Sequence, residues 1–330
     1  MPPFPKPRFK FAYDIKTEIA AIRKWEKTGP GRGIPDKAPN RLLIGTWNIA
    51  NLGVQQRRPS DYKIIAEILK WFDITAIQEV NDNLDGLRAL QKQLPKAYSL
   101  LFSDAAGNNE RMAFVYDSSK LKPLEKIGEI GIPVKDLKNI KLPGVKGHFT
   151  GFDRSPYLAA FQAGSLRFML VNVHLYFGKK GDVPSMDRRC LETFAVARWA
   201  DQRRRSKNSY CRDVIALGDF NLPKKDLSDR VFQALTRKGL KLPEHTTKVG
   251  SSLSGDEHYD QIAFYPGETA GDYTGLSGVF DYDARLFAKL WKPVELATGA
   301  KAKREARSRF WAYCRYYVSD HRPLWAQFKI

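Results

Sequence analysis

The sequence has few cysteines and no long apolar run. Its three cysteines, Cys190, Cys211 and Cys314, lie far apart in the 330 residues and form no C-x-x-C pair that would suggest zinc or a redox-active dithiol. The first residues contain no apolar segment of the kind that a signal peptide needs, and no stretch approaches the ~18 apolar residues of a membrane span. We therefore expect reduced thiols in the core, no transmembrane segment and a cytoplasmic location.

Positive charge is what the sequence has in excess. Lysine and arginine number 55 against 36 aspartate and glutamate, which gives a formal net charge of +19. Such a surplus attracts polyanions over long distances, so nucleic acid or an anionic membrane surface fits. The ordinary alternative is that the charge serves solubility alone. With 43% hydrophobic residues to form a core, we expect a globular monomer with a polyanionic partner, most consistent with nucleic acid.

The chain divides into an extension and one domain. Residues 1–40 begin Pro-rich and basic, contain a segment with helical spacing, DIKTEIAAIRKWEK, and end in GPGRGIPDKAPN. Residues 41–330 alternate short apolar strand patterns with amphipathic helix patterns and contain no linker-like stretch. We interpret residues 1–40 as an N-terminal extension with a short helix, and residues 41–330 as one α/β domain.

Polar side chains stand where the apolar strands end. They are Asn48, Glu79, His174, Asp219, Asn221, Asp260, Asp320 and His321. Each has an ordinary explanation by itself, such as a turn, a surface loop or a hydrogen-bonded core histidine. Asp219 and Asn221 are two residues apart, so both side chains face the same side of a strand, although a tight turn after the strand competes. Burying such groups singly costs several kcal/mol, so we expect the set to converge on one another, a metal or a ligand.

The ordered fragments resemble a known superfamily. LLIGTWNIANL, ITAIQEV, RSPYLAAF, VNVHLYF, VIALGDFN, HYDQIAF and VSDHRPLWAQF are similar to the successive motifs of the endonuclease/exonuclease/phosphatase superfamily, in its deoxyribonuclease I-like branch. The resemblance covers residues 42–330. It implies a four-layer α/β sandwich, with two packed, mainly antiparallel sheets flanked by helices and the site at one end.

The resemblance also implies a metal site. Glu79 matches the principal ligand of the divalent cation, with Asn48 and Asp320 nearby. Oxygen ligands of this kind suit Mg²⁺, or Mn²⁺, rather than zinc.

The remaining matches concern the phosphate and the attacking water. Asp219 matches the residue that orients or deprotonates the water, and Asn221 matches a donor to the scissile phosphate. His321 would contact that phosphate or move a proton, with Asp260 fixing its tautomer. Two further matches come from the deoxyribonuclease branch: a second histidine, His174, and a phosphate-contacting arginine, Arg154.

Other branches fit less well. GDFN is followed by LPKKDLSD, which lacks the acidic pattern of abasic-site endonucleases, and His174 stands where that branch has tyrosine. HYDQIAF lacks the pattern of inositol-polyphosphate phosphatases, and the spaced cysteines of secreted deoxyribonucleases are missing. Basic clusters at residues 179–180, 203–205 and 300–309 are candidates to hold phosphates on either side of the cleaved bond. Their ordinary alternative is a solvated helix face, and for Arg111 we favour a surface ion pair.

We therefore predict a metal-dependent phosphodiesterase, a nuclease that cleaves DNA or RNA by water attack. One alternative is a phosphatase or phosphodiesterase of lipid head groups or small phosphoesters. Another is a non-catalytic nucleic-acid-binding protein on the same fold, which would have no physical need for the whole set of polar residues.

Overall fold

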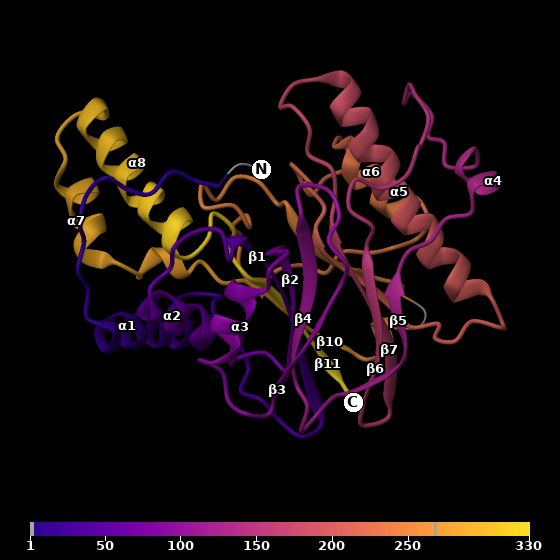
Figure 1. Ribbon diagram of the computed structural model, residues 1–330, viewed down its shortest axis with the longest axis horizontal. Helices are drawn as coiled ribbons and strands as arrows, with labels where there is room; N and C mark the ends of the chain where they lie inside the picture. Colours follow the sequence, from indigo (N-terminus) through magenta and orange to yellow (C-terminus); the bar gives the residue numbers. More distant parts are fainter. Residues whose placement is uncertain (1–2, 267–268) are drawn as a thin grey trace.

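Two β-sheets pack face to face in the computed structural model, which describes residues 3–266 and 269–330 (Figure 1). The first sheet has six strands in the order β10 (Tyr273–Val279), β11 (Leu324–Lys329), β1 (Arg41–Leu52), β2 (Ile74–Asn81), β4 (Glu110–Asp117) and β3 (Tyr98–Phe102). The second has five, in the order β5 (Lys122–Glu129), β6 (Tyr157–Ala163), β7 (Leu166–His174), β8 (Val214–Asp219) and β9 (Asp260–Phe264). The β1–β2 and β7–β8 pairs are parallel and the other strand pairs are antiparallel.

Helices cover the outer face of each sheet, so the molecule has four layers. On the first sheet lie α1 (Ile15–Thr28), α2 (Pro59–Leu69), α3 (Asp85–Gln91), α7 (Ala288–Leu296) and α8 (Ala300–Tyr317). On the second lie α4 (Val134–Leu137), α5 (Val183–Arg205) and α6 (Arg230–Thr236), and two 3₁₀ turns (Thr269–Gly271 and Tyr282–Ala284) complete the elements. The predicted α/β sandwich with mainly antiparallel sheets is confirmed.

The strands read as nearly continuous apolar runs because most are buried on both faces. In β1, Leu42 and Ile44 point into the core between the two sheets, whereas Leu43 and Trp47 point into the core under the outer helices. All four side chains are fully buried. Successive side chains along β1 therefore pack alternately into two separate hydrophobic cores.

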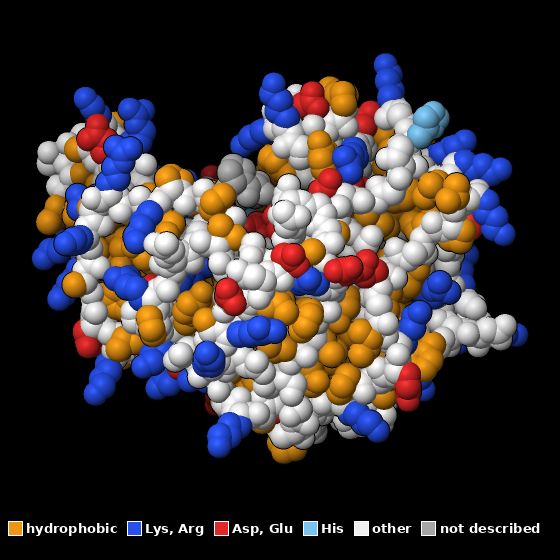
Figure 2. Space-filling view, in the orientation of Figure 1, with side chains coloured by type: hydrophobic (Ala, Val, Ile, Leu, Met, Phe, Trp, Pro, Cys, Tyr) orange, Lys and Arg blue, Asp and Glu red, His pale blue; other side chains and the backbone are white. Residues whose placement is uncertain are grey.

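The parallel pairs bring four strand ends together. Since parallel strands run in the same direction, β1 ends beside β2 and β7 ends beside β8. Contacts of β1 with β8 and of β2 with β7 hold these ends against one another across the sandwich. The surface at this end is hollowed between the α7–α8 pair and the α5–α6 side, with lysine and arginine side chains on both flanks (Figure 2).

The N-terminal extension packs onto the outer helix layer. Ile22 of α1 is fully buried, Arg23 bonds Glu67 of α2 at 2.6 Å, and the indole N–H of Trp25 donates to Asp281 at 2.8 Å. The predicted short helix is α1, while the division of the chain at residue 40 stays a prediction. Within residues 3–266 and 269–330, every helix is too short or too polar to cross a bilayer.

Candidate active site

A hydrogen-bonded bridge joins the two sheets at the hollowed end. Asn48, near the end of β1, donates its side-chain N–H groups to Glu79 Oε1 at 3.0 Å and to Asp219 Oδ2 at 3.1 Å. The other oxygen of Glu79, Oε2, accepts from the backbone N–H of Asn51 at 2.8 Å. The three polar residues predicted from separate strand ends are therefore in direct contact.

Irregular backbone aims these side chains into the site. The β1–β2 register shifts between Asn48 and Leu52, and the β2–β4 register shifts between Ile77 and Val80. Within the second shift Glu79 has a φ of 59°. A non-glycine residue in this region is uncommon and costs roughly 1–3 kcal/mol, and such costs cluster at functional sites. The bulges let the Glu79 carboxylate reach Asn48 and the backbone N–H of Asn51 on the neighbouring strand β1.

Asp219 lies at the centre of the site. Its Oδ2 is 3.7 Å from His174 Nε2 and 3.8 Å from His321 Nε2, and its Oδ1 accepts from the backbone N–H of Asn221 at 2.8 Å. Burial would raise the pKa of Asp219, but the two histidines and these hydrogen bonds outweigh burial and lower it. Asp219 is therefore an ionised, buried acceptor.

A glycine allows β8 to approach β7 closely just before Asp219. Gly218 has a φ of 130°, and a Cβ built on it would lie 2.2 Å from the carbonyl oxygen of Val173. No other residue fits there without displacing backbone. This close approach places Asp219 opposite His174 in the strand register.

His321 and Asp260 form a buried pair. His321 Nδ1 is 2.7 Å from Asp260 Oδ2, and Asp260 is fixed in turn because its backbone N–H donates to Ser251 Oγ at 2.9 Å. Burial would lower the pKa of His321, but Asp260 and Asp219 outweigh burial and raise it well above its usual value. The Nε2 side of this imidazolium faces Asp219, and the tautomer-fixing role of Asp260 stays a prediction.

The acidic residues of the site fit a hard cation. Burial, with the neighbouring Glu79 carboxylate, raises the pKa of Asp320 to about 6. Asn48 Oδ1 is buried and has no hydrogen-bond partner among the described residues, which is costly unless a ligand satisfies it. Ligand atoms of Asp219, Asp260 and His321 also lie within 4.8 Å of one another, although the short Asp260–His321 hydrogen bond occupies two of them. The site is a buried cluster of acidic and imidazole groups suited to a metal ion.

Arg154 and Asn221 brace the end of β7. Arg154 donates from Nε to the carbonyl oxygen of His174 at 2.8 Å and from Nη2 to that of Leu175 at 3.2 Å. Asn221 donates its side-chain N–H to the same Leu175 oxygen at 2.7 Å. Both side chains thus lie beside the cluster on backbone acceptors, and their contact with a phosphate stays a prediction.

The sequence interpretation missed two sets of contacts. Glu110, the first residue of β4, lies 3.0 Å from His174 Nδ1. Gln78 and Asn172 join the sheets beneath the site through a hydrogen bond of 2.6 Å from Gln78 Nε2 to Asn172 Oδ1. The contact between Gln78 and Asn172 could have been suspected from the sequence, because their amides interrupt the apolar strands AIQEV and VNVHL.

The other basic residues differ in how near they lie to the candidate site. Arg111 forms ion pairs with Asp82 and Asp104, as favoured above. Lys179 and Lys180 lie in the loop between β7 and α5, on the side of the site. Arginines 203–205 end α5, whose 23 residues span about 33 Å at ~1.5 Å per residue. Of these two clusters, the structure places only the lysines near the site.

Comparisons with known proteins agree with this fold. A solved endonuclease/exonuclease/phosphatase family protein from Bacteroides thetaiotaomicron superposes with a TM-score of 0.55 at 18% identity, covering 88% of this chain and 95% of that chain. A mannosyl-6-phosphatase from the same organism gives 0.53 at 18% identity, with 87% and 99% covered. TDP2 from D. rerio, complexed with a single-strand DNA product, gives 0.54 at 15% identity, with 88% and 99% covered. The chain therefore has the endonuclease/exonuclease/phosphatase fold that its ordered motifs predicted.

Sequence comparison adds a nearer relative. A curated deoxyribonuclease from Thioalkalivibrio sp. (strain K90mix) is 29% identical over 199 residues, which are 58% of this chain and 49% of the relative. The chain thus spans about half the length of the curated relative it matches. No family model matches the sequence.

Proposed function

We propose that the protein is a metal-dependent phosphodiesterase that hydrolyses nucleic acid. The observation that carries the proposal is the position of Asp219, whose Oδ2 lies between two imidazoles and is tied through Asn48 to Glu79. An ionised carboxylate there can orient a water molecule and accept its proton. The protonated His321 beside it can donate to an oxygen of the phosphate on which negative charge develops.

Glu79, with Asn48 and Asp320, would hold the cation. Carboxylate and amide oxygens favour Mg²⁺, with Mn²⁺ as the second choice. When bound, the cation supplies positive charge that stabilises the phosphoryl oxygens during in-line attack. Asn221 would donate to the phosphate from the Asp219 side, once its amide leaves the backbone oxygen it now contacts.

Charge and similarity support nucleic acid as the substrate. The net charge is +19, the curated relative is named a deoxyribonuclease, and exposed lysines border the site. A phosphate backbone supplies many anionic contacts to such a surface, whereas a small phosphoester supplies one. The observation that favours a second candidate, a small-phosphoester hydrolase, is the likeness in fold to the mannosyl-6-phosphatase.

The direct test is incubation with plasmid DNA and with single-stranded RNA, in Mg²⁺ and in a chelator, beside the His321→Ala variant. We expect metal-dependent cutting of at least one polymer, which the variant loses while its thermal unfolding stays near that of the wild type. Cutting by the variant at the wild-type rate would contradict the site assignment. No cutting of either polymer would favour the small-phosphoester candidate, to be followed with sugar phosphates and lipid head groups.

A salt titration tests the two basic clusters. We expect the slope of log affinity against log salt, measured with Asp219→Ala, to become shallower by up to about two units in Lys179→Ser/Lys180→Ser. Arg204→Ser/Arg205→Ser, at the far end of α5, is the matched control and should leave the slope unchanged. A slope near zero in Asp219→Ala, without the lysine changes, would contradict binding through the phosphate backbone.

A further inference from the structure

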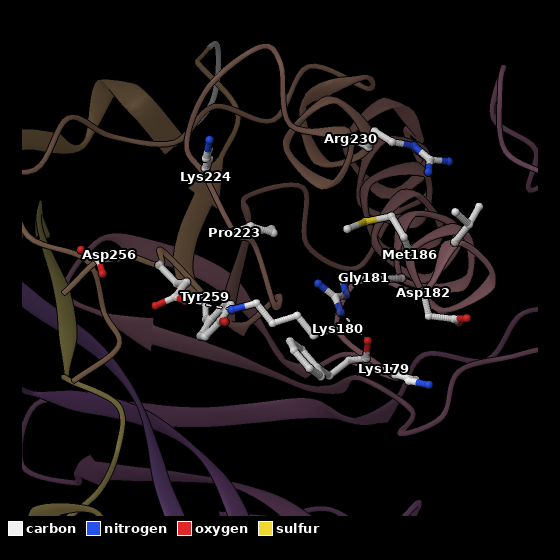
Figure 3. Close-up of a pocket in the computed structure, with 14 residues that line it drawn as sticks. Lys179, Lys180, Gly181, Asp182, Met186, Pro223, Lys224, Arg230, Asp256 and Tyr259 are labelled. Carbon is white, nitrogen blue, oxygen red and sulfur yellow. Dashed lines mark hydrogen bonds and ion pairs between the residues drawn. The ribbon is translucent and has the colours of Figure 1, made fainter. Parts of the chain in front are cut away.

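A pocket of about 500 Å³ opens beside the catalytic cluster. It lies between the loop that follows β7, the first turns of α5, the loop after β8 and the residue before β9 (Figure 3). Two contacts attach it to the site: the Tyr259 ring is 5.9 Å from the His321 ring, and Arg189 donates to the carbonyl oxygen of Asn221 at 3.3 Å. Its volume falls in the range of pockets that take small organic groups, roughly 300–1,000 Å³.

The lining offers flat aromatic and apolar surfaces. The rings of Phe177 and Tyr259 meet edge to face, with centroids 6.2 Å apart and an interplanar angle of 84°. The Arg189 guanidinium lies 4.4 Å from the centre of the Phe177 ring and is held by the backbone oxygen of Phe177. Val183, Met186 and Pro223 add apolar surface to the lining. Rings of this kind favour a flat π-system as their occupant.

The mouth of the pocket carries lysines together with the carboxylates of Asp182, Asp256 and Glu257. Lys179, Lys180 and Lys224 stand around it and are exposed (Figure 3). Lys180 is 3.8 Å from Glu257, whereas Lys179 and Lys224 have no ion pair among residues 3–266 and 269–330. An apolar interior beneath unpaired lysines matches a group that is flat and uncharged at one end and anionic at the other.

We propose that this pocket binds one nucleobase of the strand being cut, next to the scissile phosphate, so that the preferred substrate is an unpaired strand. The inference rests on the proposed nuclease function and specifies its substrate. A base inside a duplex is stacked, and it must be unstacked at a cost of a few kcal/mol before it can enter a pocket. A base that is already unpaired avoids that cost and gains about 1–3 kcal/mol from stacking on an aromatic ring.

The test uses single-stranded oligonucleotides in which a tetrahydrofuran residue replaces one base at a time around the cleaved bond. We expect kcat/KM to fall about 5- to 150-fold when one particular position loses its base, the range that a stacking contact of about 1–3 kcal/mol gives. The same sequence as a duplex should be cut more slowly. In Phe177→Leu the ratio of kcat/KM with the base to kcat/KM without it should fall toward one at that position, because the variant has already lost the ring.

Tyr210→Leu is the matched control. Tyr210 also lies under an arginine, Arg167, at 4.3 Å, but beside the start of β7, the end of the sheet away from the site. Removing its ring should leave the ratio of kcat/KM with and without the base as it is in the wild type. The comparison of substrates needs no variant, so it holds even if Phe177→Leu does not fold.

The outcomes separate the two proposals. If no oligonucleotide is cut, the nuclease function fails and the inference falls with it. If all are cut at equal rates, with or without each base, the nuclease function stands and the base pocket is wrong. A duplex cut faster than the single strand would also overturn the inference.

Discussion

The site contains two histidine–carboxylate pairs that look alike and differ in their surroundings. His321 pairs with Asp260 at 2.7 Å, and His174 pairs with Glu110 at 3.0 Å. Both imidazoles direct Nε2 toward the same oxygen of Asp219, at 3.8 and 3.7 Å. Geometry toward Asp219 alone therefore does not distinguish the two histidines.

The carboxylates make the difference. Asp260 is fully buried and its carboxylate lies 2.7 Å from His321 Nδ1, so its charge acts mainly on His321. Glu110 is 12% exposed at its side chain and also lies 3.6 Å from Arg154, so its charge is shared between a histidine and an arginine. A charge that is shared and partly solvated interacts more weakly with each of its partners. We therefore propose the proton-transfer role for His321 and a supporting role for His174.

The largest effect is expected from Asp260→Asn. The amide keeps the shape but cannot hold His321 as an imidazolium, so kcat should fall by about 10²–10⁴-fold, the usual contribution of general acid–base catalysis. His321→Asn should give a loss of the same order, measured as initial rates on the polymer that the protein cuts.

Combining the two changes sharpens this prediction. Residues that act as one unit are strongly non-additive, so the double variant should be no slower than the slower single variant. Losses that multiply would show that Asp260 and His321 act separately and would contradict the assignment.

Glu110→Gln should have a smaller effect. One hydrogen bond to a charged group is lost, which is worth about 1.5–3 kcal/mol, so kcat should fall about 10- to 150-fold. Glu129→Gln, a change at an edge strand of the other sheet, serves as the control. A loss as large as that of Asp260→Asn would erase the distinction between the two pairs.

Acid stability gives an independent measure of the Glu110 pair. Burial would raise the pKa of Glu110, but His174 and Arg154 outweigh burial and lower it to about 2. A carboxyl pKa that is lower in the folded than in the unfolded protein stabilises the fold at pH values above the unfolded pKa of about 4.3. That stability is lost as the pH falls from there toward 2. Chemical denaturation should show an extra slope of up to about 1.4 kcal/mol per pH unit, which Glu110→Gln lacks. Parallel curves of unfolding free energy against pH for the two proteins would contradict a stabilising interaction between Glu110 and His174.

The same contrast shows what the sequence could and could not predict. His321 and Asp260 lie in recognisable fragments, HYDQI and VSDHRPL, because each strand end carries its own polar residue. Glu110 opens a strand on the opposite sheet from His174, and no spacing along the chain indicates that the two meet. Strands buried on both faces, such as β1, were predictable from apolar runs alone. Contacts between sheets depend on packing, which a local pattern does not specify.

Arg154→Lys is expected to have the smallest effect on activity and decides between two roles for this arginine. If Arg154 braces β7 through its two backbone carbonyl contacts, lysine keeps the charge and loses one hydrogen bond, worth about 0.5–1.5 kcal/mol. The free energy of unfolding should then fall by that amount, and kcat/KM by less than about tenfold. If Arg154 instead contacts the phosphate, KM should rise strongly while the unfolding free energy stays the same. Paired measurements of KM and of urea denaturation separate these outcomes, because a bracing residue affects stability first and a phosphate contact affects binding first.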